Sequence, residues 1–158
     1  MPCRINHSCS QNYLQWDVPI ESVDFDPLLV NCFEGLLETE HPYQFIAMQA
    51  LTEMLQNSVA PMNVAPMISK LVLPLRQGLI SKDSKIWNNA IQATQLLAQA
   101  AGENITPHLH LMMGSFSSKM ANKLTREKVT VTLGVIERYG GPEALKVIKQ
   151  KIPAYASM

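Results

Sequence analysis

The sequence predicts an all-α protein: an armadillo- or HEAT-like helical repeat (α-solenoid) preceded by an extended N-terminal arm. After the first 26 residues, successive segments place apolar residues at helical spacing, and no segment alternates apolar and polar residues long enough for a strand. A pattern of small and large residues also recurs about every 40 residues, which is typical of stacked helix pairs. The arm is expected over residues 1–26 and a single helical domain over residues 27–158.

Prolines define the first predicted elements. The arm carries Pro, Ser, Asn and isolated aromatic residues with neither a helical nor a strand period. Asp26 followed by Pro27 predicts a helix start, because proline suits the first helical position. Pro42 opens the next predicted helix, which is expected to end near Asn57.

The middle of the chain predicts two helices of different character. A helix is expected over residues 64–79, and Pro74 is expected to kink or break it because proline lacks a backbone donor and clashes one turn back. Ser81 or Asp83 is expected to cap a longer helix, which ends at Gly102.

Glycines and prolines also divide the last third of the chain. Pro107 opens a short amphipathic segment, and the small residues at 114–118 predict a turn after it. The following helix is expected to end at Gly140 and Gly141, which can supply a left-handed C-cap, and Pro142 opens the last helix.

The internal repeat has three copies. The first two have two small residues followed by a large one, and the third follows this pattern more loosely. The copies are Ala47, Ala50 and Met54; Ala90, Ala93 and Leu97; and Val129, Thr132 and Ile136. Small residues let helix backbones approach closely, and three copies are the minimum for a stable stack. A generic helical bundle is the alternative architecture.

Composition and charge exclude several classes of protein. The 158 residues carry 13 basic and 13 acidic side chains, which argues against a nucleic-acid-binding protein. No apolar run approaches the ~18 residues of a membrane span, and no signal peptide is recognisable. The three cysteines lie near the N-terminus without repeated spacing, so a soluble cytoplasmic protein with reduced thiols and no membrane partner is expected.

No pattern in the sequence indicates catalysis. Phosphate-binding glycine loops, the nucleophile elbow and the zinc-protease helix motif are all missing, so neither enzymatic activity nor a cofactor is expected. Cys3, His7 and Cys9 could be imagined as zinc ligands, but a structural site needs four donors and Cys32 is the only distant candidate. No metal is therefore expected, and Cys32 is interpreted as a core residue.

The internal methionines allow two interpretations. At helical spacing they are typical of flexible core residues, which is the favoured interpretation; the alternative is an adaptable groove for a partner. They are Met48, Met54, Met62, Met67, Met112, Met113 and Met120.

Charges are distributed unevenly along the chain. No Lys or Arg lies between Ile5 and Ser69, whereas eight acidic residues do, and basic residues dominate from Lys70 onward. In a stack that runs from end to end, this predicts a molecule with an acidic end and a basic end. The candidate contacts for an acidic partner are Lys119, Lys123, Arg126, Lys128, Lys146, Lys149 and Lys151. Ordinary solvated helix faces are the alternative interpretation.

Several short motifs resemble one known family. They are Phe25-Asp26-Pro27-Leu28-Leu29, Glu34-Gly35-Leu36, His41-Pro42-Tyr43, Pro74-Leu75, Glu137-Arg138-Tyr139-Gly140-Gly141 and Ile152-Pro153 with Tyr155. In this order the motifs resemble the parkin co-regulated protein family over essentially the whole chain. Pro2-Cys3-Arg4 and Leu14-Gln15-Trp16 are most similar to its PACRG-like branch.

The resemblance implies a non-enzymatic armadillo-like protein of the cilium or flagellum. Its partners would be tubulin and other axonemal proteins of the doublet microtubules, at or near the inner junction, and its location the cytoskeleton of the axoneme. A soluble helical-repeat adaptor that binds a partner peptide, without being a permanent axonemal component, is the alternative.

Overall fold

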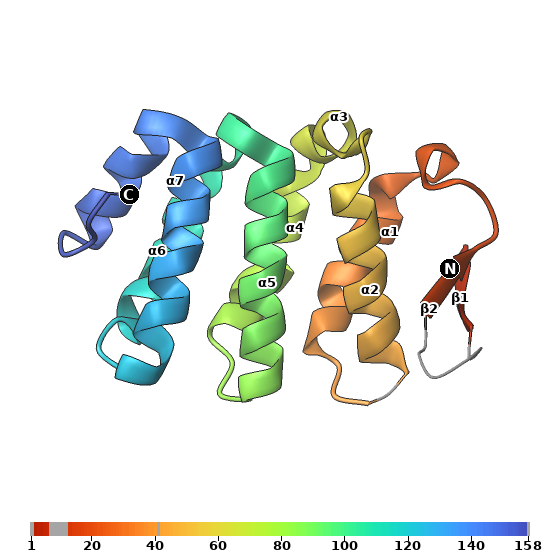
Figure 1. Ribbon diagram of the computed structural model, residues 1–158, viewed down its shortest axis with the longest axis horizontal. Coiled ribbons are helices and arrows are strands. Elements are labelled where there is room, and N and C mark those ends of the chain that lie inside the picture. The colour runs from red at the N-terminus through yellow and green to blue at the C-terminus, as the bar shows by residue number, and fades with distance from the viewer. Residues whose placement is uncertain (1, 7–12, 41, 158) are drawn as a thin grey trace.

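The computed structural model describes residues 2–6, 13–40 and 42–157, and these residues are predominantly helical. The predicted helical class is therefore confirmed. The molecule is elongated, with the two strands at one end and the C-terminus at the other, and the chain advances steadily along the long axis between them (Figure 1). Position in the sequence is thus position along the molecule.

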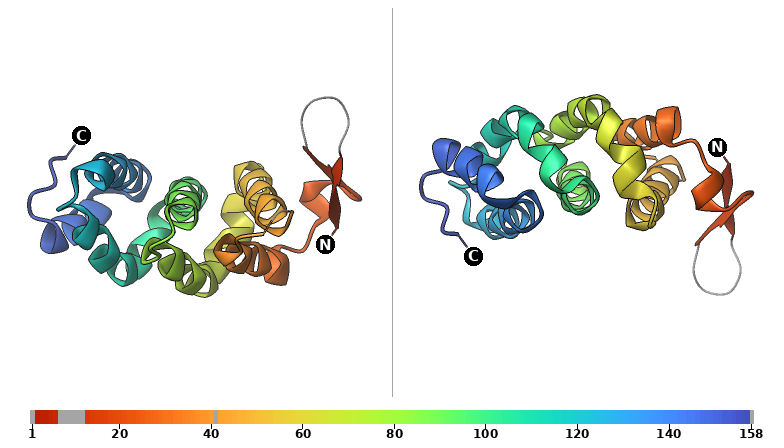
Figure 2. Two further views of the ribbon diagram at one scale, coloured as in Figure 1. Left: turned by 90° about the horizontal axis from the view of Figure 1, so that it is seen from below. Right: turned by 90° about the horizontal axis from the view of Figure 1, so that it is seen from above.

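Among the seven α-helices of the described residues, six contribute to two layers. The seven are α1 (Phe25–Glu34), α2 (Tyr43–Gln56), α3 (Ala60–Val64), α4 (Ile68–Leu79), α5 (Ser84–Ala101), α6 (His110–Lys119) and α7 (Lys123–Lys151), counted over the described residues. Figure 2 shows α1, α4 and α6 in one layer and α2, α5 and the first part of α7 in the other. In the second layer α5 packs against both α2 and α7, and α4 contacts α1 and α6 in the first.

The expectation of no strand is wrong for the N-terminal segment. Strand β1 (Cys3–Asn6) pairs antiparallel with β2 (Tyr13–Trp16), and Cys3 is opposite Trp16 in the register. Cys3 and Leu14 are buried, whereas Arg4 and Gln15 are exposed, so each strand does alternate. Four residues are too few for that period to be distinguished in the sequence. The strands contact α2, and Trp16 Nε1 donates to Glu53 Oε1 at 3.4 Å.

The start of α1 follows the Asp-Pro signal with one modification. The helix is assigned from Phe25, but Asp26 has non-helical angles (φ −102°, ψ 120°), and regular helix begins at Pro27 after a cis peptide bond. The Asp26 carboxylate accepts a hydrogen bond from Lys70 Nζ at 2.6 Å, which joins α1 to α4. Pro42 is the N-cap residue of α2, as expected.

The segment expected as one helix over residues 64–79 is divided elsewhere than predicted. Helix α3 is followed by a 3-10 turn at Ala65–Met67, and α4 then continues without interruption through the buried Pro74 to Leu79. A break at Pro74 is therefore wrong. Leu71 before the proline and Leu75 after it are fully buried, so their packing keeps the helix continuous through Pro74.

Helix α5 has the boundaries that the sequence predicts. The Asp83 side chain accepts from the backbone N–H groups of Lys85 and Ile86, at 2.9 and 3.1 Å, and so caps the helix. Gly102 follows the last residue with a φ of 57°. This left-handed value explains the glycine.

The turn expected at residues 114–118 is wrong, because α6 runs through it to Lys119. Met112, Met113 and Phe116 are buried on one face of this helix, and Gly114 is exposed. Burial of that apolar face outweighs the low helix propensity of the glycine and serine residues.

Helix α7 is interrupted where glycines predict its end. Gly141 has non-helical angles (φ 79°, ψ −165°), and Pro142 begins the second helical part. Gly140 is buried, and a Cβ there would lie 2.6 Å from the Ala144 Cβ. After α7 the buried Tyr155 donates to Glu137 Oε1 at 2.8 Å, and burial together with this bond raises the pKa of Tyr155.

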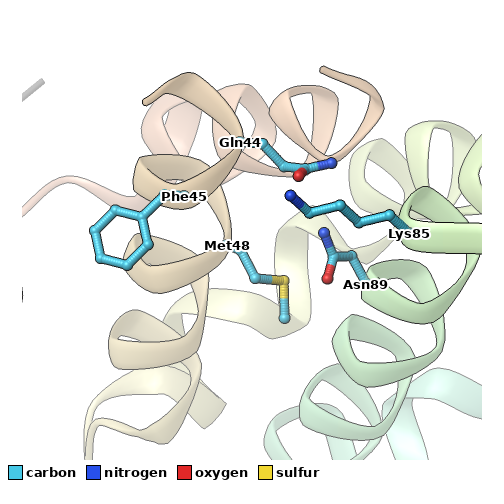
Figure 3. A pocket seen from close by; sticks show the side chains of 5 residues that line it. All are labelled: Gln44, Phe45, Met48, Lys85 and Asn89. Atoms are coloured by element: carbon cyan, nitrogen blue, oxygen red, sulfur yellow. The ribbon is translucent and has the colours of Figure 1, made fainter. Parts of the chain in front are cut away.

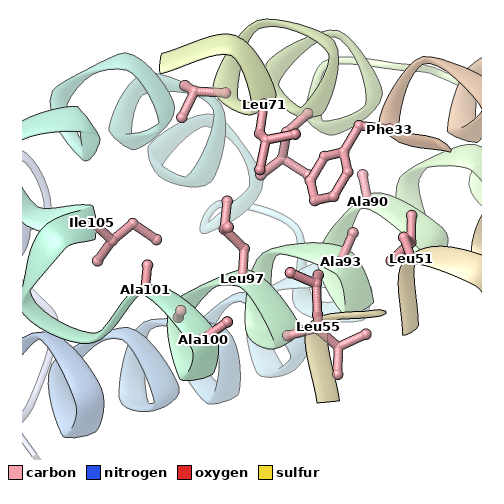
Figure 4. Packing of buried hydrophobic residues seen from close by; sticks show 14 of the residues in the cluster. Phe33, Leu51, Leu55, Leu71, Ala90, Ala93, Leu97, Ala100, Ala101 and Ile105 are labelled. Atoms are coloured by element: carbon pink, nitrogen blue, oxygen red, sulfur yellow. The ribbon is translucent and has the colours of Figure 1, made fainter. Parts of the chain in front are cut away.

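Small residues bring the two layers together. A Cβ at Gly35 would lie 2.5 Å from the Ala47 Cβ, and a Cβ at Gly78 would lie 2.8 Å from the Ala90 Cβ. Figure 4 shows Ala90 and Ala93 of α5 beside Phe33 and Leu71 of the other layer. The first two copies of the predicted repeat therefore begin with an alanine packed against a glycine of the preceding helical segment.

Membrane-span criteria leave one marginal case among the described residues. No single helix there is long and apolar enough to cross a membrane. The pair Tyr43–Gln56 and Ala60–Leu79 meets the length and composition criteria together, with a bend of 112° between its members.

Candidate binding surface

The charges are graded along one edge of the molecule, which we call the turn edge. It consists of the turns that join α1 to α2, α4 to α5 and α6 to α7, at the lower side of Figure 1. Its charged residues are, from the N-terminal to the C-terminal turn, Glu38 and Glu40, then Lys82, Asp83 and Lys85, then Lys119, Lys123 and Arg126. The turn edge therefore changes from acidic to basic along the long axis.

Two of the predicted cations converge on one aromatic ring. Lys119 Nζ lies 5.6 Å and Lys128 Nζ 6.0 Å from the ring centroid of Trp87 on α5. Lys128 Nζ also donates to Asn88 Oδ1 at 2.6 Å. The indole thus holds two positive charges from α6 and α7 near each other, because its electron-rich face attracts both.

Two more of the predicted cations, Lys123 and Arg126, lie at the same turn but are not among the cations over the Trp87 ring. Arg126 Nε donates to the Met120 carbonyl at 2.8 Å, and Thr125 Oγ1 donates to the Lys119 carbonyl at 2.7 Å. Lys123 is exposed at the first position of α7. These bonds brace the turn and hold the Arg126 guanidinium in a defined position.

The C-terminal cations form a separate basic segment. Lys146, Lys149 and Lys151 are exposed on the part of α7 that follows the interruption at Gly141. Lys146 Nζ is 2.9 Å from Glu143 Oε1, and both side chains are about 70% exposed, so this ion pair is weak. The structure therefore provides two basic segments on different helical parts.

Sequence reasoning missed a groove of about 500 Å³ between α5 and α7. One wall presents amide side chains from α5, and the other presents Leu124, Lys128 and Val131 from α7. Glu127 also lines it. Leu124 is 84% exposed and Val131 52% exposed, which is unusual for large apolar side chains. Their spacing with Lys128 at three and four residues was the available signal, but it resembles an ordinary helix face.

A smaller groove of about 270 Å³ separates α2 from α5. Figure 3 shows Lys85 and Asn89 of α5 extending toward Gln44 and Met48 of α2. Phe45 also lines the groove, although its ring points away from the gap in this view. Both grooves lie between helices of the same layer.

The methionines divide between the two interpretations. Met54, Met67, Met112 and Met113 are buried and belong to the core, as favoured. Met48 lines the groove between α2 and α5. The exposed Met62 and the half-buried Met120 lie outside both grooves.

The cysteine chemistry expected at the N-terminus is only partly described. Cys3 and Cys32 are free and buried, and burial raises the pKa of Cys32 to about 12 and also raises that of Cys3. Such thiols are poor nucleophiles at neutral pH. The candidate ligands His7 and Cys9 lie outside the described residues. Within the part of the chain that is described, no group of three His, Cys, Asp or Glu side chains could hold a metal ion.

Comparisons with known proteins agree on one family. A family model described as parkin co-regulated protein matches residues 1–157 of this chain. The mouse parkin coregulated gene protein homolog is 26% identical over 174 residues, which cover 99% of this chain and 71% of the mouse protein. The match extends over the strands, both helical layers and the basic segments.

Proposed function

The chain belongs to the parkin co-regulated protein family, and on that premise we propose that it is a non-enzymatic structural protein of ciliary or flagellar doublet microtubules. It binds tubulin and neighbouring axonemal proteins at or near the inner junction. The observation that carries this proposal is the charge gradient along the turn edge, because tubulin is strongly acidic and the basic end offers a complementary surface.

The architecture that we propose for this role is an armadillo-like solenoid. The contacts Gly35–Ala47 and Gly78–Ala90 support it, since each glycine and each alanine recurs at the same interval along the chain. Such stacks expose long surfaces on which several partners can bind side by side. A charge gradient along the stack then orients the protein between unlike neighbours.

The docking surface that we propose is centred on Lys119, Lys123, Arg126 and Lys128. Trp87 holds two of these charges together, and the bond of Arg126 to the Met120 carbonyl holds a third in place. Positioned charges lose less side-chain entropy on binding than freely rotating ones. The segment with Lys146, Lys149 and Lys151 is a second proposed contact, whose exposed lysines are not held by an aromatic ring.

Co-sedimentation with microtubules tests the surface. The double variant Lys123→Glu, Arg126→Glu should bind at least about fivefold more weakly, because it reverses two rim charges facing an acidic partner. The matched control is Arg4→Glu, Arg76→Glu, which changes the net charge equally at exposed positions outside the surface. Thermal melting shows whether each variant is folded. Equal binding of both double variants would eliminate this surface.

The groove between α5 and α7 favours a second candidate function, a soluble adaptor that binds a partner peptide. Salt extraction of isolated axonemes separates the two candidates. A permanent component should remain with the doublets at high salt, because charge contacts that are buried in an assembly are screened much less than exposed ones, whereas an adaptor held by exposed contacts should be released.

A further inference from the structure

The groove between α5 and α7 has two chemically different walls. The α5 wall carries the amides of Asn88, Gln92 and Gln95, whose spacing of four and three residues places them in one row. The α7 wall carries Leu124, Lys128 and Val131 in a matching row. A row of amides therefore faces a row of Leu124, Lys128 and Val131, and Ile91 on α5 and Glu127 on α7 complete the lining.

We propose that this groove binds an extended, acidic peptide segment of a partner protein. The inference rests on the proposed function, because the segment belongs to the acidic partner proposed there. It adds which part of this chain recognises that segment. The segment carries carboxylates beside Lys128 and toward the turn with Lys119, and apolar side chains against Leu124 and Val131.

The amide row selects an extended segment over a helix. A primary amide has donors and an acceptor, and an extended main chain has unpaired N–H and C=O groups that need such partners. Asn88 Oδ1 already accepts from Lys128 Nζ at 2.6 Å across the groove, so Asn88 offers its Nδ2 donors. The main-chain groups of a helix already bond to one another. Gln95 Nε2 donates to Thr132 Oγ1 at 3.0 Å across the groove, so the amide at this position already bonds to the opposite wall.

The α7 wall determines the composition of the segment. Leu124 and Val131 are about 10 Å apart along the helix axis and are both more than half exposed, so an apolar side chain placed between them removes water from both. Lys128 lies between them, and Lys119 and Lys123 are at the nearby turn. In the lining itself Lys128 is balanced by Glu127, so it is the neighbouring Lys119 and Lys123 at the turn that make the surroundings of the groove positive and favour carboxylates.

A fluorescein-labelled peptide tests the proposal by anisotropy with the full chain. The probe contains Glu, Leu and Pro and is about seven residues long, which at ~3.3 Å per residue spans the groove from Leu124 to Val131 and extends beyond it. Its prolines exclude a helix. The acidic probe should bind, and the same peptide with Lys in place of Glu should bind at least about tenfold more weakly.

Variants locate the binding to the groove. Val131→Glu should weaken the acidic probe about tenfold or more, since it removes an apolar contact and adds a like charge. Gln92→Ala should weaken it about fivefold through the lost amide. The control is Leu73→Glu, because Leu73 is 60% exposed on α4 in the other layer and should leave binding within about twofold of wild type.

Each alternative outcome contradicts a defined part of the proposal. Unchanged binding by Val131→Glu rules out the groove, and equal binding of the Lys peptide rules out an acidic occupant. Tighter binding of a proline-free helical version rules out the extended conformation. If the wild-type chain sediments with microtubules but does not bind the acidic probe, the groove inference fails while the proposed function stands; binding of the probe without sedimentation gives the reverse result.

Discussion

Gly78 at the end of α4 lies so close to Ala90 on α5 that a Cβ added at position 78 would be 2.8 Å from the Ala90 Cβ. Real Cβ atoms essentially never approach that closely, so the two layers meet at this point only because residue 78 has no side chain. Gly35 and Ala47 repeat the relationship one helix pair earlier. The small residues of the repeat thus have a direct structural role.

Gly78→Ala should lower the free energy of unfolding by about 1–3 kcal/mol, because the added methyl group overpacks the contact with Ala90. Gly114→Ala is the matched control in the exposed part of α6, where nothing lies within 4 Å of the added Cβ. It should raise stability by about 0.5–1 kcal/mol through helix propensity. Urea denaturation measures both, and a similar effect of the two substitutions would contradict the close contact.

Asp83→Ala should destabilise the protein by about 1 kcal/mol, since it leaves the N–H groups of Lys85 and Ile86 without their cap. Asp24 is the N-cap residue of α1 but makes no side-chain cap bond. Asp24→Ala should therefore change stability by less than about 0.5 kcal/mol. Thermal unfolding of the two variants checks the difference, and equal losses would show that the Asp83 cap does not matter.

Lys128→Met should cost about 0.5–1 kcal/mol of stability, because it removes the cation over Trp87 and the bond to Asn88 while keeping most of the side-chain length. Lys123→Met removes the same charge from an exposed position and should be nearly neutral. Chemical denaturation followed by circular dichroism compares them. If Lys123→Met is the more damaging, the indole does not hold Lys128.

Stability should fall with pH in the alkaline range because of Cys32. An unfolded thiol loses its proton near pH ~8.5, whereas burial raises the pKa of Cys32 in the folded chain to about 12. Within this window the folded state binds more protons than the unfolded state, so the free energy of unfolding decreases as pH rises. Urea midpoints measured from pH about 9 to about 11 should fall more steeply for wild type than for Cys32→Ala. Parallel slopes would contradict the buried thiol.

The candidate surface was only partly predictable. The basic residues around the α6–α7 turn could be found in the sequence because they are close together along the chain. That Lys119 and Lys128 both approach Trp87 could not, since these residues lie on three different helices. The groove between α5 and α7 could not be predicted either. It depends on which face of α5 lies against α7, and helical periodicity does not specify which helix packs on a given face.

The sequence by itself determined the helical class and the boundaries with strong local signals: the start of α5 at Ser81 or Asp83, its end at Gly102 and the interruption at Gly141. These features depend on one or two neighbouring residues, so local physics is sufficient. It also determined the order of acidic and basic residues along the chain, and the elongated stack turned that order into a gradient in space. Tertiary structure alone decided the strands at Cys3–Asn6 and Tyr13–Trp16, the passage of α4 through Pro74 and that of α6 through Gly114. In each case packing against a distant element outweighed the local preference.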